Sequence, residues 1–150
     1  MNISKALKEK NRLIGQLNKI KEVLARENSR RDDSVSKIDR SQLSLEFKAT
    51  QTKLVELKTA INKASVPIFA SIIAMAELKS TIEFYKTLPT REGKEIQILG
   101  RQGETKEYTW NSYINQQTVD EMIKESELTI NKLQDIIDDF NASTQVDYKP

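Results

Sequence analysis

The sequence contains neither cysteine nor histidine, and its 150 residues include only four glycines and three prolines. Without cysteine the chain can form no disulfide and no thiolate zinc site. Without histidine it lacks the side chain that titrates nearest to neutral pH and that most often serves as a general base. The scarcity of glycine and proline leaves few positions for turns, so the composition predicts long helices.

Motifs that would indicate catalysis are also missing. There is no glycine-rich phosphate loop, because Gly100 and Gly103 have the spacing of a turn rather than of a nucleotide-binding motif. No spacing places a nucleophile beside a base. We therefore expect a protein that is not an enzyme and has no catalytic residues, metal ligands or cofactor. One acidic group leaves two interpretations open: Asp135, Asp138 and Asp139 either face lysine or arginine from the first helix or chelate a divalent cation.

Charge is distributed unevenly along the chain although the formal net charge is only +2. Within residues 1–31, nine lysines and arginines stand against three glutamates. Lys5, Arg12, Lys19 and Arg26 recur at every seventh position, so a helix carries them as one basic stripe on its outer line. Such a stripe is either a solvated face or a binding site for an anionic partner, which would be an acidic protein or a nucleic acid.

Hydrophobic periodicity predicts about four long helices. They span roughly residues 2–28, 41–63 with Ser41 as the N-cap, 66–88, and from 118 onward. The alternating steps of three and four are typical of antiparallel coiled coils. We expect a mostly α-helical chain that forms a single domain over residues 1–150, with a frayed tail over residues 141–150.

The third predicted helix contains a block without charge, residues 64–76. It is apolar on more than one face, which is typical of a helix surrounded by others. Its thirteen residues are fewer than the roughly 20 that a membrane span requires. We therefore expect no membrane insertion and assign the block to the centre of a bundle or to a subunit interface, with Ile68, Phe69, Ile72, Ile73 and Met75 as candidate contact residues.

A β-hairpin is predicted over about residues 94–110, where a period of two replaces the helical period. A five-residue loop, 101–105, would place Ile98 opposite Tyr108 and Ile96 opposite Trp110. That register gathers four large apolar side chains on one face, and both edges of the hairpin stay open. We therefore expect Ile96, Ile98, Tyr108 and Trp110 to take part in an oligomer interface.

Three segments resemble the septicolysin-like group of uncharacterised bacterial helical proteins: "ISKALKEKNRLIGQL", "TAINKAS" and "LQDIIDDFNASTQ". The resemblance implies a bacterial helical oligomer of unknown role. In architecture the chain is also similar to beta-type prefoldin subunits, which place a β-hairpin between long coiled-coil helices and assemble through those hairpins.

From these patterns we expect a non-enzymatic coiled-coil protein that associates with itself, as a dimer or higher oligomer, and acts as a scaffold or interaction module. One alternative is a prefoldin-like holdase chaperone, and another is nucleic-acid binding through the basic stripe. The opening residues "MNISKALKEK" lack the apolar run of a signal peptide, so we expect a cytoplasmic location.

Overall fold

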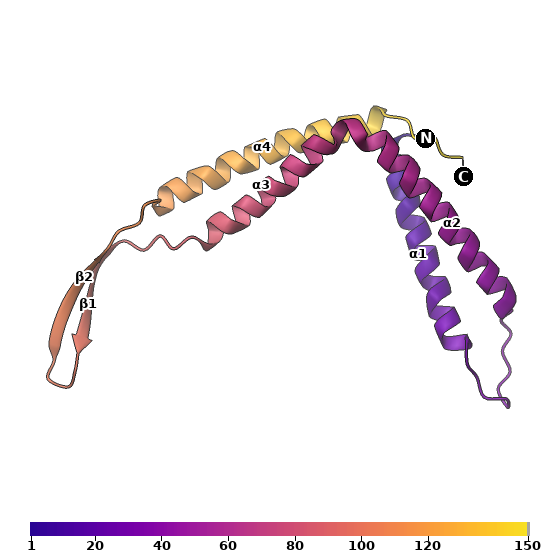
Figure 1. Ribbon diagram of the computed structural model, residues 1–150, viewed down its shortest axis with the longest axis horizontal. Coiled ribbons are helices and arrows are strands. Elements are labelled where there is room, and N and C mark those ends of the chain that lie inside the picture. The colour runs from indigo at the N-terminus through magenta and orange to yellow at the C-terminus, as the bar shows by residue number, and fades with distance from the viewer. Residues whose placement is uncertain (150) are drawn as a thin grey trace. The chain divides into compact units, whose positions relative to one another are not determined.

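The computed structural model describes residues 1–149, and 68% of the chain is helical. The expected fold class is confirmed at this level: the protein is mostly α-helical, with one antiparallel β-hairpin inserted before the last helix (Figure 1). In chain order the elements are α1 (Ile3–Glu27), α2 (Arg40–Ser65), the 3-10 turn η1 (Val66–Ile68), α3 (Phe69–Thr87), β1 (Gly93–Leu99), β2 (Glu104–Trp110) and α4 (Gln116–Ser143).

The number of helical segments differs from the expected four. Helical residues run from α2 through η1 into α3 without interruption, so the described residues contain three continuous helical segments. Pro67 lies in the first turn of η1, and it has no N–H to continue the hydrogen bonding of α2. The proline therefore marks a local 3-10 turn rather than a loop. Coiled-coil packing of these helices remains a prediction.

Side-chain caps fix where the first two helices begin. The Asn2 side chain accepts a hydrogen bond from the Lys5 backbone N–H at 2.9 Å, which satisfies one of the free donors at the start of α1. Asp39 does the same for α2 by accepting from the Gln42 N–H at 3.0 Å. The prediction of Ser41 as the cap was wrong, because the Asp39 carboxylate precedes it and α2 begins at Arg40.

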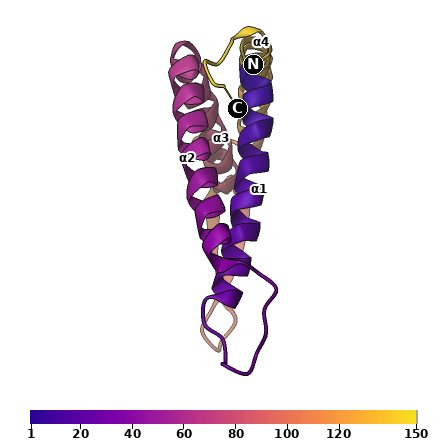
Figure 2. The same ribbon diagram turned by 90° about the vertical axis from the view of Figure 1, so that its right-hand side faces the viewer.

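The chain divides into two compact units, and the first contains residues 1–69 and 137–149. In this unit α1 and α2 run side by side and are joined by the loop over residues 28–39 (Figures 1 and 2). Their facing stripes form the core, because the apolar positions recur at helical spacing on both helices. The fully buried members of this core are Ile3, Ala6, Leu13, Leu17, Leu54, Leu57, Ile61 and Val146.

The C-terminal tail belongs to this core, so the expectation that residues 141–150 fray was wrong for the residues that the structure describes. The Ile3 N–H donates to the Thr144 carbonyl at 3.0 Å, and the Val146 N–H donates to the Met1 carbonyl at 2.8 Å. Asn2 adds a third link, because its side-chain amide donates to the Ala142 carbonyl at 2.9 Å. Both ends of the chain are therefore held together, as the adjacent N and C labels in Figures 1 and 2 show.

The second unit, residues 70–136, consists of most of α3, the hairpin and most of α4. Ile82 on α3 and Val119 near the start of α4 are the only hydrophobic residues in this range that are fully buried. The Thr118 N–H donates to the Asn115 side chain at 2.8 Å, which caps the start of α4. This unit therefore has caps and helices but a very small core.

The hairpin forms where the sequence predicts it, but the predicted register was wrong. Ile96 pairs with Glu107 and Ile98 with Thr105, whereas Tyr108 pairs with Glu95. Since successive side chains of a strand point to opposite faces, the two isoleucines lie on one face and the two aromatic residues on the other. The four apolar side chains do not gather on one face.

Turn geometry explains the difference in register. Gly100 and Gly103 have φ values of 71° and 74°, in the left-handed region that glycine adopts without strain. They close a four-residue turn instead of the five-residue loop that we predicted. Polar contacts across the strands accompany this register, because Lys94 forms a salt bridge with Glu107 at 3.1 Å. Turn geometry thus outweighs the alignment of apolar side chains.

Candidate interaction surfaces

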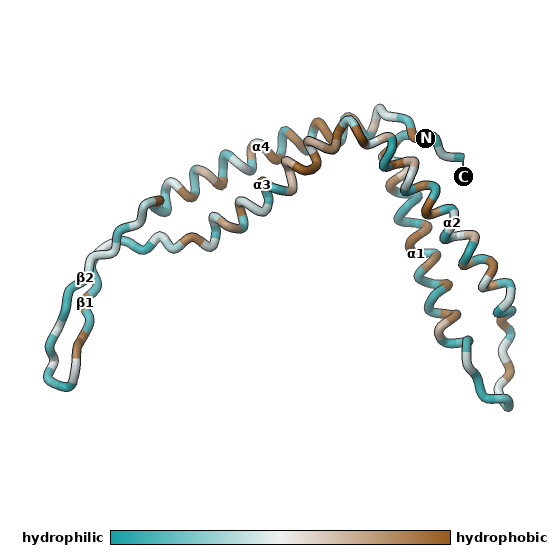
Figure 3. Tube along the Cα trace, in the orientation of Figure 1, coloured by the Kyte–Doolittle hydropathy of each residue, from teal (hydrophilic) through white to brown (hydrophobic). Residues whose placement is uncertain are grey.

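The first candidate surface is the exposed side of α3. This helix is rich in alanine and isoleucine, yet Ile82 is its only fully buried residue. Phe69 is 41% exposed, Ile72 37% and Ile73 62%. Met75 is half-buried, and Ile68 lies just before α3 and is buried within the first unit. The block that begins near η1 and continues into α3 is brown over much of its length in Figure 3. Of the predicted contact residues, Phe69, Ile72 and Ile73 are the ones that a partner can reach.

The hairpin provides a second surface, divided between its two faces. On one face Ile96 and Ile98 are 67% and 74% exposed. On the other face Trp110 donates its indole N–H to Glu95 at 2.5 Å, and the Arg91 guanidinium lies 4.7 Å from the centre of its ring. The hydrogen bond from Trp110, followed by the charge of Arg91, holds the pKa of the Glu95 carboxyl below its ordinary value.

The aromatic face therefore carries charged groups, whereas the isoleucine face lacks an apolar cover. Tyr113, which follows the hairpin, is fully exposed. Tyr113 therefore does not pack against the helices within the described chain. The hairpin's apolar side chains are available to a partner.

The total accessible surface agrees with these exposures. The chain leaves 11430 Å² accessible to solvent. A compact monomer of its 17.2 kDa mass exposes about 7,800 Å², so this chain exposes about 3,600 Å² more than a compact chain of that mass.

The predicted basic stripe lies on α1, and all four of its residues are exposed. Two of them have acidic neighbours: Arg12 makes two hydrogen bonds to Glu9, each 2.7 Å long, and Arg26 lies 3.4 Å from Glu27. The hydrogen bonds from Arg12 hold the pKa of Glu9 below its ordinary value. Within residues 1–149, Lys5 and Lys19 form no salt bridge. The stripe thus presents two free cations and two that are locally neutralised.

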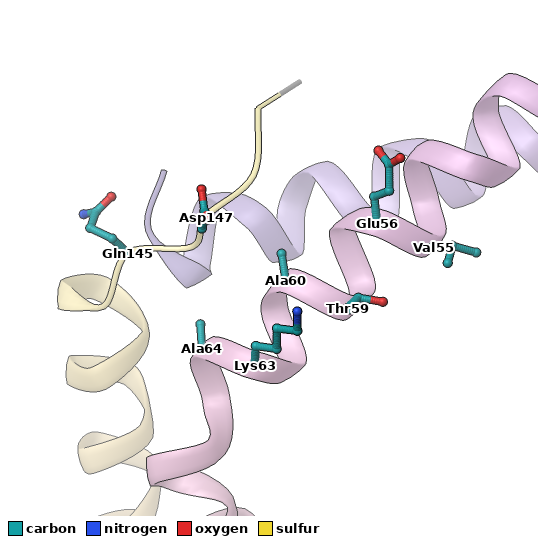
Figure 4. Close-up of a pocket in the computed structure, with 8 residues that line it drawn as sticks. All are labelled: Val55, Glu56, Thr59, Ala60, Lys63, Ala64, Gln145 and Asp147. Atoms are coloured by element: carbon teal, nitrogen blue, oxygen red, sulfur yellow. The ribbon is translucent and has the colours of Figure 1, made fainter.

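An open depression of about 560 Å³ lies in the first unit, between α2 and the C-terminal tail (Figure 4). Glu56, Thr59 and Lys63 line it from α2, and Gln145 and Asp147 line it from the tail. Its charged groups, Glu56, Lys63 and Asp147, have mixed sign. Within the described part of the chain, no group of three or more His, Cys, Asp or Glu side chains is placed to hold a metal ion.

The uninterrupted helical stretch Arg40–Thr87 includes a segment that is long and apolar enough to cross a membrane, with a mean hydropathy of 1.4. One such helix is weak evidence for a membrane span, because helices that pack against protein have the same composition. Lys63 and Glu77 enclose the uncharged block, whose thirteen residues extend about 20 Å as a helix, compared with about 30 Å for the hydrocarbon core of a bilayer.

Comparison with known proteins gives no relative: no family model, no curated protein and no solved structure matches this chain. Functional inference therefore rests on the surfaces described above.

Proposed function

We propose that this protein is a non-enzymatic, self-associating helical protein that acts as a scaffold or interaction module. The observation that carries the proposal is the small core of the second unit, in which Ile82 and Val119 are the only fully buried hydrophobic residues among residues 70–136. A folded unit must offset the conformational entropy of its ordered residues by burying apolar surface. The second unit has few buried apolar residues, which supports a partner surface that covers the rest.

The same unit exposes the apolar side chains that a partner would cover. On α3 these include Ile73 and Phe84, which are 62% and 57% exposed, and on α4 they include Leu128 at 55%. Isolated exposed apolar residues are normal in monomers, but several of them on one poorly packed pair of helices are typical of a binding surface. A copy of the same chain is always present at the site of synthesis, and homo-oligomers are the commonest assemblies of soluble proteins.

Sedimentation velocity at micromolar concentration tests the proposal directly. We expect a mass at least twice the 17.2 kDa of one chain. Shortening the hairpin by replacing residues 94–109 with a glycine-serine loop then shows whether the hairpin contributes. A wild-type mass that equals one chain over the whole concentration range would contradict self-association.

A second candidate, a prefoldin-like holdase, is favoured by the same exposed side chains, since Phe69, Ile73 and Phe84 could also contact an unfolded client. The two functions differ in what the assembled protein leaves exposed. A holdase keeps its apolar surface accessible after assembly and binds a hydrophobic dye in the folded state. A protein that uses this surface for self-association binds the dye only when it is diluted to monomers.

A further inference from the structure

The outer edge of strand β1 has no neighbouring strand within residues 1–149, because the hairpin is a two-stranded sheet. A two-stranded hairpin alone is at best marginally stable in water, and additional strands stabilise it. The free edge of β1 presents backbone N–H and C=O groups that can pair with another strand. The hairpin therefore has an unused pairing site, and this site lies wholly within the second unit.

The two edges of the hairpin differ in how strongly they oppose such pairing. Charged side chains on an edge strand discourage association with another strand. The charged residues of β2 are spread along the strand (Glu104, Lys106 and Glu107), whereas those of β1 are confined to its start (Lys94 and Glu95). Within the uncharged remainder of β1, Ile96 and Ile98 are 67% and 74% exposed and Leu99 is 43% exposed. The edge of β1 is therefore the one suited to pairing.

The uncharged part of β1 is suited to pairing with a second copy of itself. Ile96 and Ile98 flank Gln97, so antiparallel pairing centred on Gln97 places the Ile96 of each copy opposite the Ile98 of the other. Residues directly opposite each other point to the same face of a sheet, so the isoleucines of both copies gather on one face. A register shifted by one residue would instead join the isoleucine face of one copy to the aromatic face of the other, which carries charged groups.

We propose that two copies of this chain pair antiparallel along strand β1, with the two-fold axis at Gln97. The inference rests on the proposed self-association and names the edge and the register that carry it. The two hairpins then form one four-stranded sheet in the order β2, β1, β1, β2, which supplies the additional strands that one hairpin lacks. Both outer edges of this sheet are β2 strands, whose charges oppose further pairing, so this contact joins two copies and no more.

An engineered cysteine tests the register, because the chain has no cysteine of its own. In the proposed pairing Gln97 stands opposite Gln97 of the second copy, with the two Cα atoms about 4.5–5.5 Å apart. A disulfide requires Cα atoms roughly 4.4–6.8 Å apart. Gln97 is exposed, so Gln97→Cys should keep the fold. This variant should form a disulfide-linked dimer in oxidised glutathione, which non-reducing gel electrophoresis measures.

Cysteines at two other positions of β1 provide the matched control. In the proposed register Glu95 of one copy stands opposite Leu99 of the other, so each residue lies four positions, about 13 Å, from its own counterpart. Glu95→Cys alone and Leu99→Cys alone should therefore stay unlinked. An equimolar mixture of these two variants should form the mixed disulfide, because the two cysteines then stand directly opposite each other.

A charge placed on the paired edge should weaken the dimer. Ile98→Lys removes both pairs of opposed isoleucines and adds a lysine to the edge, so the dimer dissociation constant should rise by about tenfold. Thr105→Lys is the matched control, because Thr105 pairs with Ile98 within the hairpin and lies on β2, away from the proposed contact. It should leave the constant within about twofold of wild type. A dilution series in the analytical ultracentrifuge measures both constants.

The outcomes separate this inference from the proposed function. Linking at Gln97→Cys together with weakening by Ile98→Lys supports the paired β1 edges. An oligomeric wild type would overturn this pairing, and leave self-association standing, if Gln97→Cys links no faster than Glu95→Cys or if Ile98→Lys associates as tightly as wild type. A wild type that is monomeric at every concentration would overturn both.

Discussion

Val146→Asp tests whether the C-terminal tail is part of the folded core. Val146 is 4% exposed and packs in the cluster that includes Ile3 and Leu57, and its N–H donates to the Met1 carbonyl. Burying a valine side chain contributes about 1.5–3 kcal/mol, and a backbone hydrogen bond contributes roughly 1 kcal/mol net. An aspartate at this position finds no partner in the cluster, so the tail must leave it. The substitution should therefore lower the free energy of unfolding by about 2–4 kcal/mol. This loss cannot exceed the free energy with which the tail docks, because the tail can leave the core entirely.

Thermal unfolding followed by far-ultraviolet circular dichroism measures the effect. For a unit of this size the predicted loss lowers the midpoint by roughly 10–20 °C. Val35→Asp is the matched control, because Val35 is 95% exposed in the loop between α1 and α2 and the same change should have almost no effect there. Equal midpoints for the two variants would mean that the tail does not pack against α1, and the docking derived from Val146 would be wrong.

Two further predictions concern ionisation. Trp110 is the only tryptophan, and its indole N–H donates to Glu95, whose pKa lies below the usual 4.5. The fluorescence of the protein should therefore change as the pH falls from 4.5 through this lowered pKa, and Glu95→Gln should abolish that transition. Glu9 has a lowered pKa because Arg12 donates two hydrogen bonds to it, so its stabilising contribution is complete above the ordinary pKa and is lost as the pH falls through the lowered one. Denaturant titrations at a series of pH values from above 4.5 downward should show a smaller loss of stability for Arg12→Gln than for wild type, and an identical loss would contradict the linkage.

The extents of the helices were predictable because they follow from local chemistry. Apolar spacing placed the first helix at residues 2–28, and α1 spans Ile3–Glu27. A period of two placed the hairpin at residues 94–110, close to the observed strands. Each of these features depends on residues near one another in the sequence, where helical and strand periods differ clearly.

Features that depend on distant residues or on turn geometry were not predictable in the same way. The hairpin register is fixed by the left-handed conformations of Gly100 and Gly103, and counting apolar residues on each strand gives no information about them. The docking of Val146 depends on Met1 and Ile3 at the opposite end of the chain. A tail rich in polar residues has no periodicity that would reveal such a contact. The one available signal was a single valine between polar neighbours.

The exposed face of α3 is a case in which the helix was predicted correctly from local sequence but its burial was not. Its sequence predicts a helix surrounded by other helices, whereas one chain leaves Phe69, Ile72 and Ile73 accessible. The apolar periodicity of a helix predicts which of its faces is suited to burial. It does not distinguish burial by the same chain from burial by another copy. If the helices of one chain sufficed, a sequence this apolar would leave Ile73 covered. Ile73 is 62% exposed within one chain, and its cover by a second copy is part of the proposed self-association.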